Sequence, residues 1–436
     1  MSGCSRRQFL TGGALAALGG TLALASCAPM SHEEAAAKKR EAAAGNDKNA
    51  DGEVTAIGTG MGKHGEFTVE VSAKDGAIDR ITVLDSRETP GMGDVAMEKM
   101  TQAIIDNQTL AVDTISGATL TSMAFLTAVG SALDAMGESA DDWKNREPAA
   151  WVSDVELREE ADVVVIGAGG AGFAAAITAA NEGKSVVLMD KMGVFGGDTA
   201  LSGGEMAVPG NWIQVTQGIE DSPENLVSDM LVGGDNKGDP ELVAIIANGA
   251  LDSANWLTYE GGVSWKHDLM QFGGHNIKRS IIPITHSGSE MTTKLTNRVN
   301  DMDDIVLIDN TKAVELVTDD AGAVTGVKVE NPVTGDTSEV KCKAVVLATG
   351  GFGSNVDMRV KYNPEMDDKI LSTDSVAAQG DGIVMAEKIG ADTIDMEYIQ
   401  TYPVCDPETG ALLYVGDVRL ENHGILVNRE GDRFVQ

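Results

Sequence analysis

An apolar run followed at once by a glycine cluster most constrains how this 436-residue chain can fold. Residues 161–166 (ADVVVI) are typical of a strand buried in a parallel sheet, and residues 167–172 (GAGGAG) follow directly. Residues 173–182 predict a helix and residues 184–189 a second strand, which ends at Asp190, 23 residues after the first glycine. A glycine motif alone is weak evidence, but strand, turn, helix and acid together predict a dinucleotide-binding unit.

Four positions of this unit have roles that follow from its geometry. Gly167 makes the turn, Gly169 lets the backbone approach a pyrophosphate, and Gly172 lets the helix pack closely on the strand. Asp190 is expected to accept hydrogen bonds from the adenosine ribose. The residues expected to contact the cofactor here are Gly167, Ala168, Gly169, Ala171, Gly172, Asp190 and Lys191.

The segment after the acid distinguishes FAD from NAD as the cofactor. Residues 196–206 (GGDTALSGGEM) resemble the G-G-N-T/S-x-x-S-G-G segment of the fumarate reductase flavoprotein family, with Asp198 in place of Asn. Residues 345–353 (VVLATGGFG), the G-D-G sequence at 380–382 and the strand at 311–317 resemble further parts of that family. Tight turns would explain any one of these glycine clusters, but not their shared order. The resemblance implies non-covalent FAD, contacted also by Gly197, Asp198, Thr199, Ser202, Gly203, Gly204, Ala313, Ala348, Thr349, Gly350, Gly380 and Asp381.

A hydroxyl-rich stretch at residues 113–122 (DTISGATLTS) precedes this unit. Residues 67–72 and 77–84 predict strands, and residues 97–107 and 124–136 predict helices. The stretch therefore opens the second helix of a small α+β domain. A Ser or Thr N-cap would explain a lone S-G-A-T sequence at such a helix start.

The longer string D-x-x-S-G-A-T, followed by T-S, favours a cofactor site over a simple cap. It resembles the FMN-binding domain of sodium-pumping quinone reductase subunits and exported flavoproteins. The resemblance implies that a flavin transferase links the phosphate of FMN to Thr119 through a phosphoester. A covalent link would keep the cofactor from diffusing away outside the cell.

Residues 397–404 (EYIQTYPV) resemble the entrance to the capping domain that closes over the flavin in this family. Fumarate reductases carry H-P-T at the end of this stretch, with the His on a substrate carboxylate, whereas this chain has Tyr402. Tyr402 and Asp417 together resemble urocanate reductases, in which Tyr replaces that His and a downstream Asp contacts the imidazole ring. A core aromatic and a turn acid are the alternative interpretation. Glu205 and Arg419 are further polar candidates.

The sequence ends on residues 424–436, which predict a hairpin, whereas members of the family continue beyond it. The resemblance places the proton-donating Arg beyond residue 436. The chain is therefore interpreted as C-terminally truncated and is expected to reduce no substrate by itself. Turnover by these 436 residues alone would contradict both the truncation and the placement of the Arg beyond residue 436.

The N-terminus is typical of an export signal. Residues 5–10 (SRRQFL) match a twin-arginine pattern, and the glycine-rich apolar run that follows is a weak permanent anchor. Residues 24–27 (LASC) resemble a lipobox with lipidation at Cys27, and cleavage after residues 23–25 (ALA) is the alternative. We therefore expect export in folded form to the cell surface or periplasm, with a lipid anchor at Cys27.

Charge and composition exclude several functional classes. The net charge of −34 argues against nucleic acid and anionic lipid as partners. The four cysteines form no C-x-x-C pair and the six histidines are scattered, so no metal site is predicted. Any redox cofactor should therefore be organic.

These segments together predict an α/β chain. Its main part is a Rossmann-like FAD-binding domain of the fumarate reductase flavoprotein type, preceded by a small α+β FMN-binding domain. Residues 307–340 predict a β-meander in the larger domain. The predicted order is a signal (1–27), a linker (28–50), the FMN-binding domain (51–138), a linker (139–158), the FAD-binding domain (159–398) and the incomplete start of a capping domain (399–436).

The resemblance implies an exported two-flavin reductase. Electrons from a membrane-linked donor would reach FMN and then FAD, which would give hydride to the β-carbon of an α,β-unsaturated carboxylate. Urocanate, reduced to imidazole propionate, is the expected substrate, with fumarate and cinnamate-like enoates as alternatives. Two other functions stay open: a ketosteroid-type dehydrogenase of the same fold, and an electron carrier without a substrate.

Overall fold

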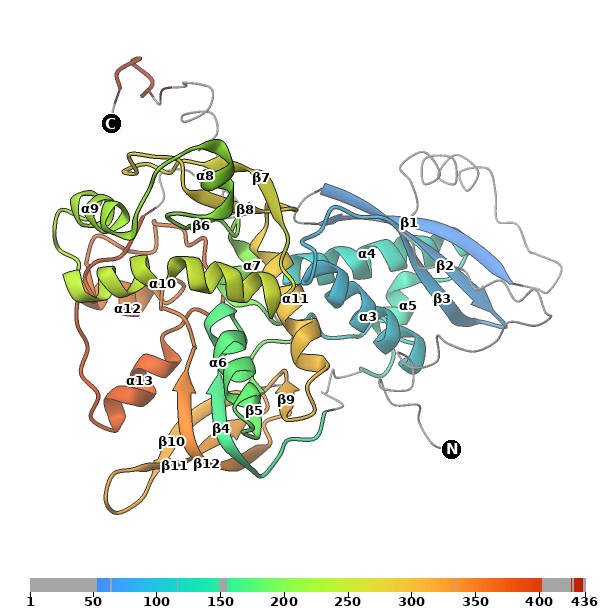
Figure 1. The fold of residues 1–436 in the computed structure, drawn as a ribbon. Coiled ribbons are helices and arrows are strands. Elements are labelled where there is room, and N and C mark those ends of the chain that lie inside the picture. The colour runs from blue at the N-terminus through green and yellow to red at the C-terminus, as the bar shows by residue number, and fades with distance from the viewer. Residues whose placement is uncertain are drawn as a thin grey trace, which may run out of the picture.

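The computed structural model describes residues 53–62, 65–115, 117–148, 155–332, 334–401, 425 and 427–433. Figure 1 shows two parts that lie side by side, a small domain in blue and teal and a larger domain in green to red. Helices and strands alternate in the larger part and pack as separate layers in the smaller one. The predicted α/β class is therefore confirmed.

The small domain packs helices on one three-stranded antiparallel sheet. Residues Phe67, Val69 and Val71 alternate along the central strand, and all three are buried against the helices, as expected for a sheet with one covered face. Its strands are β1 (Val54–Gly62), β2 (Gly65–Lys74) and β3 (Ala77–Asp85), and its helices are α3 (Gly93–Asn107), α4 (Thr119–Met136) and α5 (Ala140–Lys144).

Strand β1 is missing from the sequence-based prediction because glycines interrupt its apolar pattern. These glycines allow a close approach to α4. A Cβ atom on Gly58 would lie 1.8 Å from the carbonyl oxygen of Ala128, and one on Gly60 would lie 2.0 Å from that of Ala124. Helix α4 also begins at Thr119, before the predicted start at residue 124, so part of the hydroxyl-rich stretch forms its first turn.

The larger domain is built on a six-stranded sheet with the order β10-β11-β12-β4-β5-β9. Strands β12, β4, β5 and β9 run parallel, while β10, β11 and β12 are antiparallel neighbours. The strands of this sheet are β4 (Glu160–Ile166), β5 (Val186–Met189), β9 (Ile305–Ile308), β10 (Lys312–Thr318), β11 (Val324–Glu330) and β12 (Thr337–Leu347).

The predicted meander over residues 307–340 is wrong at its start. Residues 307 and 308 belong to β9, which pairs with β5 at the opposite edge of the sheet from β10. The turn at Asn310, with φ of 46°, separates β9 from the true meander, which begins with β10.

Helices cover this sheet, and a small second sheet lies above it in Figure 1. Helix α6 packs on β4 and β5, and α11 packs on α6 and β9. The remaining elements are α6 (Gly170–Asn181), α7 (Gly197–Leu201), β6 (Met206–Ala207), α8 (Trp212–Gln217), α9 (Pro223–Gly233), α10 (Pro240–Tyr259), β7 (Trp265–Met270), β8 (Ser280–Pro283), α11 (Gly288–Asn300), α12 (Val356–Tyr362) and α13 (Asp381–Lys388).

The two domains share a hydrophobic core. Val194 and Ala200 of the larger domain are 4% and 1% exposed and pack in the core cluster of the small domain. Lys99 of α3 forms a buried ion pair with Asp309 and donates a hydrogen bond of 2.6 Å to the carbonyl oxygen of Gly193. The two domains are therefore docked through both apolar and charged contacts.

Candidate functional site: two cavities that meet at one segment

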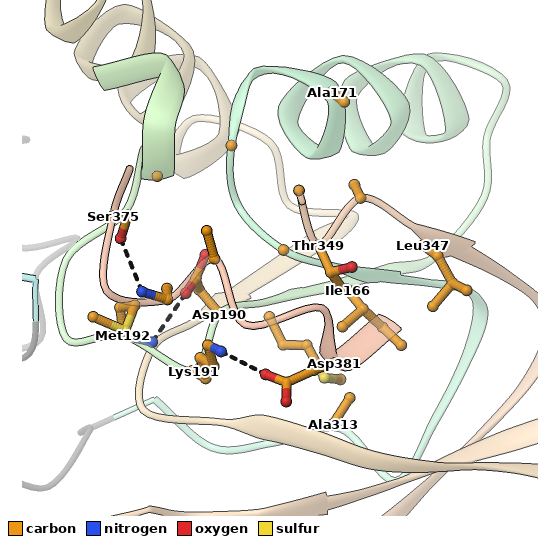
Figure 2. Close-up of a pocket in the computed structure, with 18 of the residues that line it drawn as sticks. Ile166, Ala171, Asp190, Lys191, Met192, Ala313, Leu347, Thr349, Ser375 and Asp381 are labelled. Atoms are coloured by element: carbon orange, nitrogen blue, oxygen red, sulfur yellow. Dashed lines mark hydrogen bonds and ion pairs between the residues drawn. The ribbon is translucent and has the colours of Figure 1, made fainter. Parts of the chain in front are cut away.

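A cavity of about 360 Å³ opens at the carboxyl ends of β4 and β5, where residues of β10 and β12 also line it (Figure 2). Ligands of open α/β sheets bind at this edge. Gly169 is the N-cap of α6, and both Gly169 and Gly170 line the cavity. The unpaired N–H groups and the dipole of a helix N-terminus favour phosphate. The cavity is thus suited to the pyrophosphate of a dinucleotide.

The glycine motif has the geometry that such a site requires. Gly167 has φ of 102°, and a Cβ atom there would lie 2.3 Å from the carbonyl oxygen of Ala348. A Cβ on Gly172 would lie 1.8 Å from the carbonyl oxygen of Gly167. A Cβ on Gly169 would meet no atom closer than 3.8 Å, so its face is open toward the cavity. The turn at Gly167 and the close packing at Gly172 agree with the prediction, and the open face at Gly169 leaves room for a pyrophosphate.

Substitution of Gly172 tests the packing role. We expect Gly172→Ala to weaken FAD affinity by about ten- to a hundredfold, because overpacking of this kind costs about 1–3 kcal/mol and displaces α6 from β4. Gly249→Ala in α10 is the control, since a Cβ there meets nothing within 4 Å. Titration of the FAD-free proteins with FAD measures both affinities. Equal affinities for the two variants would show that close packing at Gly172 is not needed.

Asp190 stands at the end of β5 and lines the cavity. Its carboxylate accepts hydrogen bonds of 2.9 Å from the backbone N–H groups of Ala168 and Met192. Burial raises the pKa of Asp190, although these two bonds and Lys191 act in the opposite direction. Asp190 thus holds the glycine turn in place, and each of its oxygens can accept a further bond from a ribose hydroxyl.

Two cations and a carboxylate meet at one side of the cavity, and Figure 2 shows the pair of Lys191 with Asp381. The Nζ atom of Lys191 lies 2.5 Å from Oδ2 of Asp381, and that of Lys312 lies 3.8 Å from Oδ1 of the same side chain. Asp381 is in the first turn of α13, where a negative charge is favourable. The group is only partly exposed and fixes Lys191 beside Asp190.

Asp198, the position where this chain departs from the family motif, joins two distant segments. Its Oδ1 accepts a hydrogen bond of 2.5 Å from the backbone N–H of Ser375. The neighbouring Thr199 accepts a bond of 3.1 Å from the N–H of Gly170 through its Oγ1. Burial raises the pKa of Asp374, and the charge of Asp198 raises it further. The segment around Ser375 is thereby held against the cavity.

Most of the residues predicted to contact FAD line this cavity, and their role as FAD contacts stays a proposal. The cavity brings together Gly167, Gly169, Ala171, Asp190, Lys191, Gly197, Asp198, Thr199, Ala313, Ala348, Thr349, Gly350 and Asp381.

Six other predicted residues lie behind or beside the lining. Ala168 and Gly172 pack beneath the glycine turn, and Gly380 is the N-cap of α13 with φ of 78°. The turn after α7 contains Ser202, Gly203 and Gly204, where the Ser202 hydroxyl donates to the carbonyl oxygen of Thr199. Further lining residues were not predicted from the sequence: Met192, Thr311, Lys312, Ser375, Ala377, Ala378 and Met385. For Ser375 and its neighbours, the run of small residues before the G-D-G sequence was the one available signal.

A second cavity, of about 200 Å³, lies between the two domains next to Thr119. Thr119 is the first residue of α4, and Ala118 is the N-cap with no side-chain hydrogen bond. A Ser or Thr N-cap is therefore not the role of this stretch in the part of the chain that the structure describes. The cavity contains an exposed hydroxyl at Thr119, to which no hydrogen bond from another described residue is directed.

The two hydroxyls that follow in the first turn of α4 have structural partners. The Ser122 hydroxyl donates to the carbonyl oxygen of Ala118 at 2.9 Å and accepts from the N–H of Ile115 at 3.1 Å. The Thr121 hydroxyl donates to the carboxylate of Glu88 and is buried. Thr119 thus differs from its neighbours in having both exposure and a cavity, which fits it for attachment of a group.

The substrate-side predictions are only partly placed. Glu205 is 8% exposed at its side chain, and its Oε1 lies 2.6 Å from Nε2 of His286, so it is already paired within the protein. Tyr402, Asp417 and Arg419 lie outside the described residues, as do Cys27 and Ser116. Near the end of the chain, Val427 and Arg433 form an antiparallel bridge, in agreement with the predicted hairpin.

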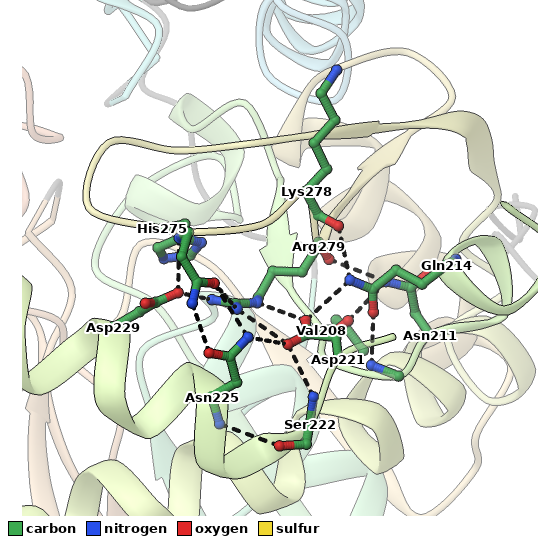
Figure 3. A network of polar contacts seen from close by, with 12 residues as sticks. Val208, Asn211, Gln214, Asp221, Ser222, Asn225, Asp229, His275, Lys278 and Arg279 are labelled. Atoms are coloured by element: carbon green, nitrogen blue, oxygen red, sulfur yellow. Dashed lines mark hydrogen bonds and ion pairs between the residues drawn. The ribbon is translucent and has the colours of Figure 1, made fainter. Parts of the chain in front are cut away.

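A third polar cluster, shown in Figure 3, lies outside both cavities. The guanidinium of Arg279 is fully buried, with Nε 2.8 Å from Asp221 and one terminal nitrogen 2.6 Å from Asp229. Burial and the charge of Arg279 lower the pKa of His275 beside it. These contacts join the segment before β8 to α9, so the cluster stabilises the fold.

Comparison with known proteins gives matches to both domains. The FAD binding domain family matches residues 162–436, and the FMN-binding domain family matches residues 62–134. Urocanate reductase of Eggerthella lenta is 55% identical over 436 residues, which are 100% of this chain and 71% of that protein. NADH:acrylate oxidoreductase of Vibrio harveyi is 32% identical over 449 residues, 88% of this chain and 44% of that protein.

Solved structures show the same fold for the larger domain. The open conformation of a flavocytochrome c3 fumarate reductase is 32% identical, with a TM-score of 0.53 over 59% of this chain and 48% of that one. A quinol-fumarate reductase with menaquinol molecules is 28% identical, with a TM-score of 0.53 over 64% of this chain and 45% of that one. The chain thus spans about half or less of each of these two proteins.

Proposed function

Because this chain belongs to the FAD binding domain family and shares its whole length with urocanate reductase, we propose that it is a flavin-dependent reductase of urocanate. The observation that carries this proposal is the 55% identity across both the FMN-binding and the FAD-binding domain. The chain is an oxidoreductase with domains for two flavins. Urocanate would be reduced at its side-chain double bond to imidazole propionate.

The residues of the first cavity fit FAD. The glycine turn and the start of α6 would hold the pyrophosphate, Asp190 would hold the ribose, and Ala313 lies where the adenine is expected. When bound, FAD supplies the hydride for the β-carbon of the substrate. The chain contributes a partly enclosed cavity and the backbone N–H groups at the start of α6.

The residues proposed to recognise the substrate are Tyr402 and Asp417. A carboxylate at position 417 suits the N–H of an imidazole ring and repels the second carboxylate of fumarate. Tyr402 would replace the His that binds a carboxylate in fumarate reductases. The Arg that donates the proton to the α-carbon is proposed to lie beyond residue 436.

Covalent FMN is proposed at Thr119, attached by a flavin transferase. The exposed Thr119 hydroxyl in the second cavity supports this assignment, since the hydroxyls of Thr121 and Ser122 serve the fold. Electrons would enter at this FMN from a membrane-linked donor. Export by the twin-arginine route, with a lipid anchor at Cys27, is proposed from the N-terminal sequence alone.

The substrate assignment predicts a clear preference. With reduced viologen as donor under anaerobic conditions, we expect the full-length, flavin-loaded protein to oxidise the dye with urocanate and not with fumarate. Asp417→Ala should lower the urocanate rate by at least about tenfold, since a hydrogen bond to a charged group contributes about 1.5–3 kcal/mol. Asp432→Ala is a control, because Asp432 is exposed in the terminal turn.

Other results would select another function. Fumarate and acrylate reduction are the second candidates, because relatives that carry those names are 31–37% identical to parts of this chain. A rate with fumarate alone would replace the urocanate assignment and reduce Tyr402 to a packing residue. Rapid electron exchange with a donor but no rate with any enoate would indicate an electron carrier.

A further inference from the structure

We propose that the FAD-binding domain supplies half of the FMN site. The FMN ring would lie between the first turn of α4 and residues 372–376, on the outer side of the segment whose inner side lines the FAD cavity. This inference rests on the proposed attachment of FMN to Thr119 and adds where the attached ring binds.

The second cavity is composite. Gly117, Thr119 and Leu120 line it from the small domain, and Asp374 and Val376 line it from the larger one. Its volume of about 200 Å³ is below the roughly 300–1,000 Å³ of pockets that enclose a complete ligand. The space therefore suits the flat ring of a flavin, while a phosphate on the exposed Thr119 side chain stays near solvent.

The rim of this cavity is apolar on both sides. Leu120 is 51% exposed and Val376 is 66% exposed, and both line the same cavity from different domains. Apolar surface left in water costs about 25 cal/mol per Å². A planar aromatic group between Leu120 and Val376 would cover this surface, and the attachment point at Thr119 is the residue before Leu120.

One segment separates the two cavities. Ser375 lines both of them and is 8% exposed. Its N–H donates to Asp198 at 2.5 Å, and its carbonyl oxygen accepts from the Ser354 hydroxyl at 2.8 Å. The wall between the flavins is thus a single, firmly held stretch of backbone.

The docked position of α4 also keeps the composite site assembled. A Cβ on Gly117 would lie 2.7 Å from Cγ2 of Val194, so the turn before Thr119 already touches the larger domain. The buried pair of Lys99 with Asp309 fixes α3 to the same surface. No domain rotation is needed to bring the ring to the wall.

The test places a charge on the proposed wall. In the flavin-loaded protein, we expect Val376→Asp to weaken contact with the ring, so that acrylamide quenches FMN fluorescence at least about threefold more efficiently than in the unmodified protein. A carboxylate at position 376 would lose water when the ring covers it, and this cost accounts for an effect of this size. Val232→Asp is the matched control, because Val232 is 68% exposed on α9 and lines neither cavity. The Thr119→Val variant, which is expected to keep FAD and lack FMN, gives the emission of FAD that is subtracted from each measurement.

The outcomes separate this inference from the function on which it rests. If no flavin survives denaturation on the unmodified protein, covalent FMN itself is wrong. If FMN is attached but Val376→Asp and Val232→Asp give the same quenching as the unmodified protein, the ring binds elsewhere and the composite site is wrong. FAD content should be unchanged in both variants, because neither side chain lines the FAD cavity.

Discussion

Thr119→Val is expected to remove all covalently bound flavin and leave FAD binding unchanged. Valine has nearly the shape of threonine but no hydroxyl for a phosphoester. The hydroxyl of Thr119 is exposed and receives no hydrogen bond from the described residues, so the fold should not change. Flavin fluorescence in a denaturing gel and the intact mass measure attachment, after co-expression with a flavin transferase.

Thr121→Val is the matched control two residues along the helix. Its hydroxyl is buried and donates to the carboxylate of Glu88, so this variant should lower stability by about 1.5–3 kcal/mol and keep its covalent flavin. Covalent flavin that persists on Thr119→Val would move the attachment to another hydroxyl. If Thr119→Val keeps its FAD but the donor no longer reduces that FAD, the FMN of the small domain carries electrons from the donor to FAD.

Arg279→Met should destabilise the larger domain by about 3–5 kcal/mol, because it leaves two buried carboxylates without their cation. Arg279 is fully buried and contacts both Asp221 and Asp229 (Figure 3). Thermal unfolding and hydrogen exchange of residues 221–283 measure the loss. Lys328→Met is the control, since its pair with Glu315 is exposed and such pairs contribute at most about 1 kcal/mol.

The pH dependence of this variant has a definite sign. Burial acts to raise the pKa of Asp221, but the bonds from Arg279 and two amide side chains outweigh burial and lower the pKa. The pair therefore contributes stability above the unfolded pKa of about 3.9, and loses it as the pH falls through the lower folded value. Without Arg279 burial dominates, so the destabilisation should be largest near neutral pH and shrink in acid. A loss that is independent of pH would contradict this explanation.

The dinucleotide unit could be predicted because its determinants are local. The glycine motif, the flanking strands and Asp190 lie within one βαβ stretch of sequence, and the structure places them at one cavity. The same holds for α3 and α4, whose apolar residues repeat with helical spacing. The spacing of apolar residues predicts whether a segment is a helix or a strand, and the glycine motif predicts which end of the strand lies at the ligand site.

What the sequence could not predict depends on distant contacts. Gly58 and Gly60 weaken the strand pattern of β1, and only the close approach of α4 explains them. The pattern of β9 does not show which edge of the sheet it joins. Ser375 is a cavity residue because Asp198, far away in sequence, holds its backbone. The hydroxyls of Thr119 and Thr121 likewise differ through tertiary packing, which buries Thr121 and leaves Thr119 exposed.

The shared core makes each domain depend on the other to cover its apolar surface. Val194 and Ala200 belong to the larger domain, yet they are buried in the core of the small one. A larger domain without this small domain would leave these side chains in water, and it would need polar residues or a different apolar partner there. Removal or exchange of the small domain would therefore uncover an apolar patch at Val194 and Ala200, and the larger domain of this chain should lose solubility when it is produced alone.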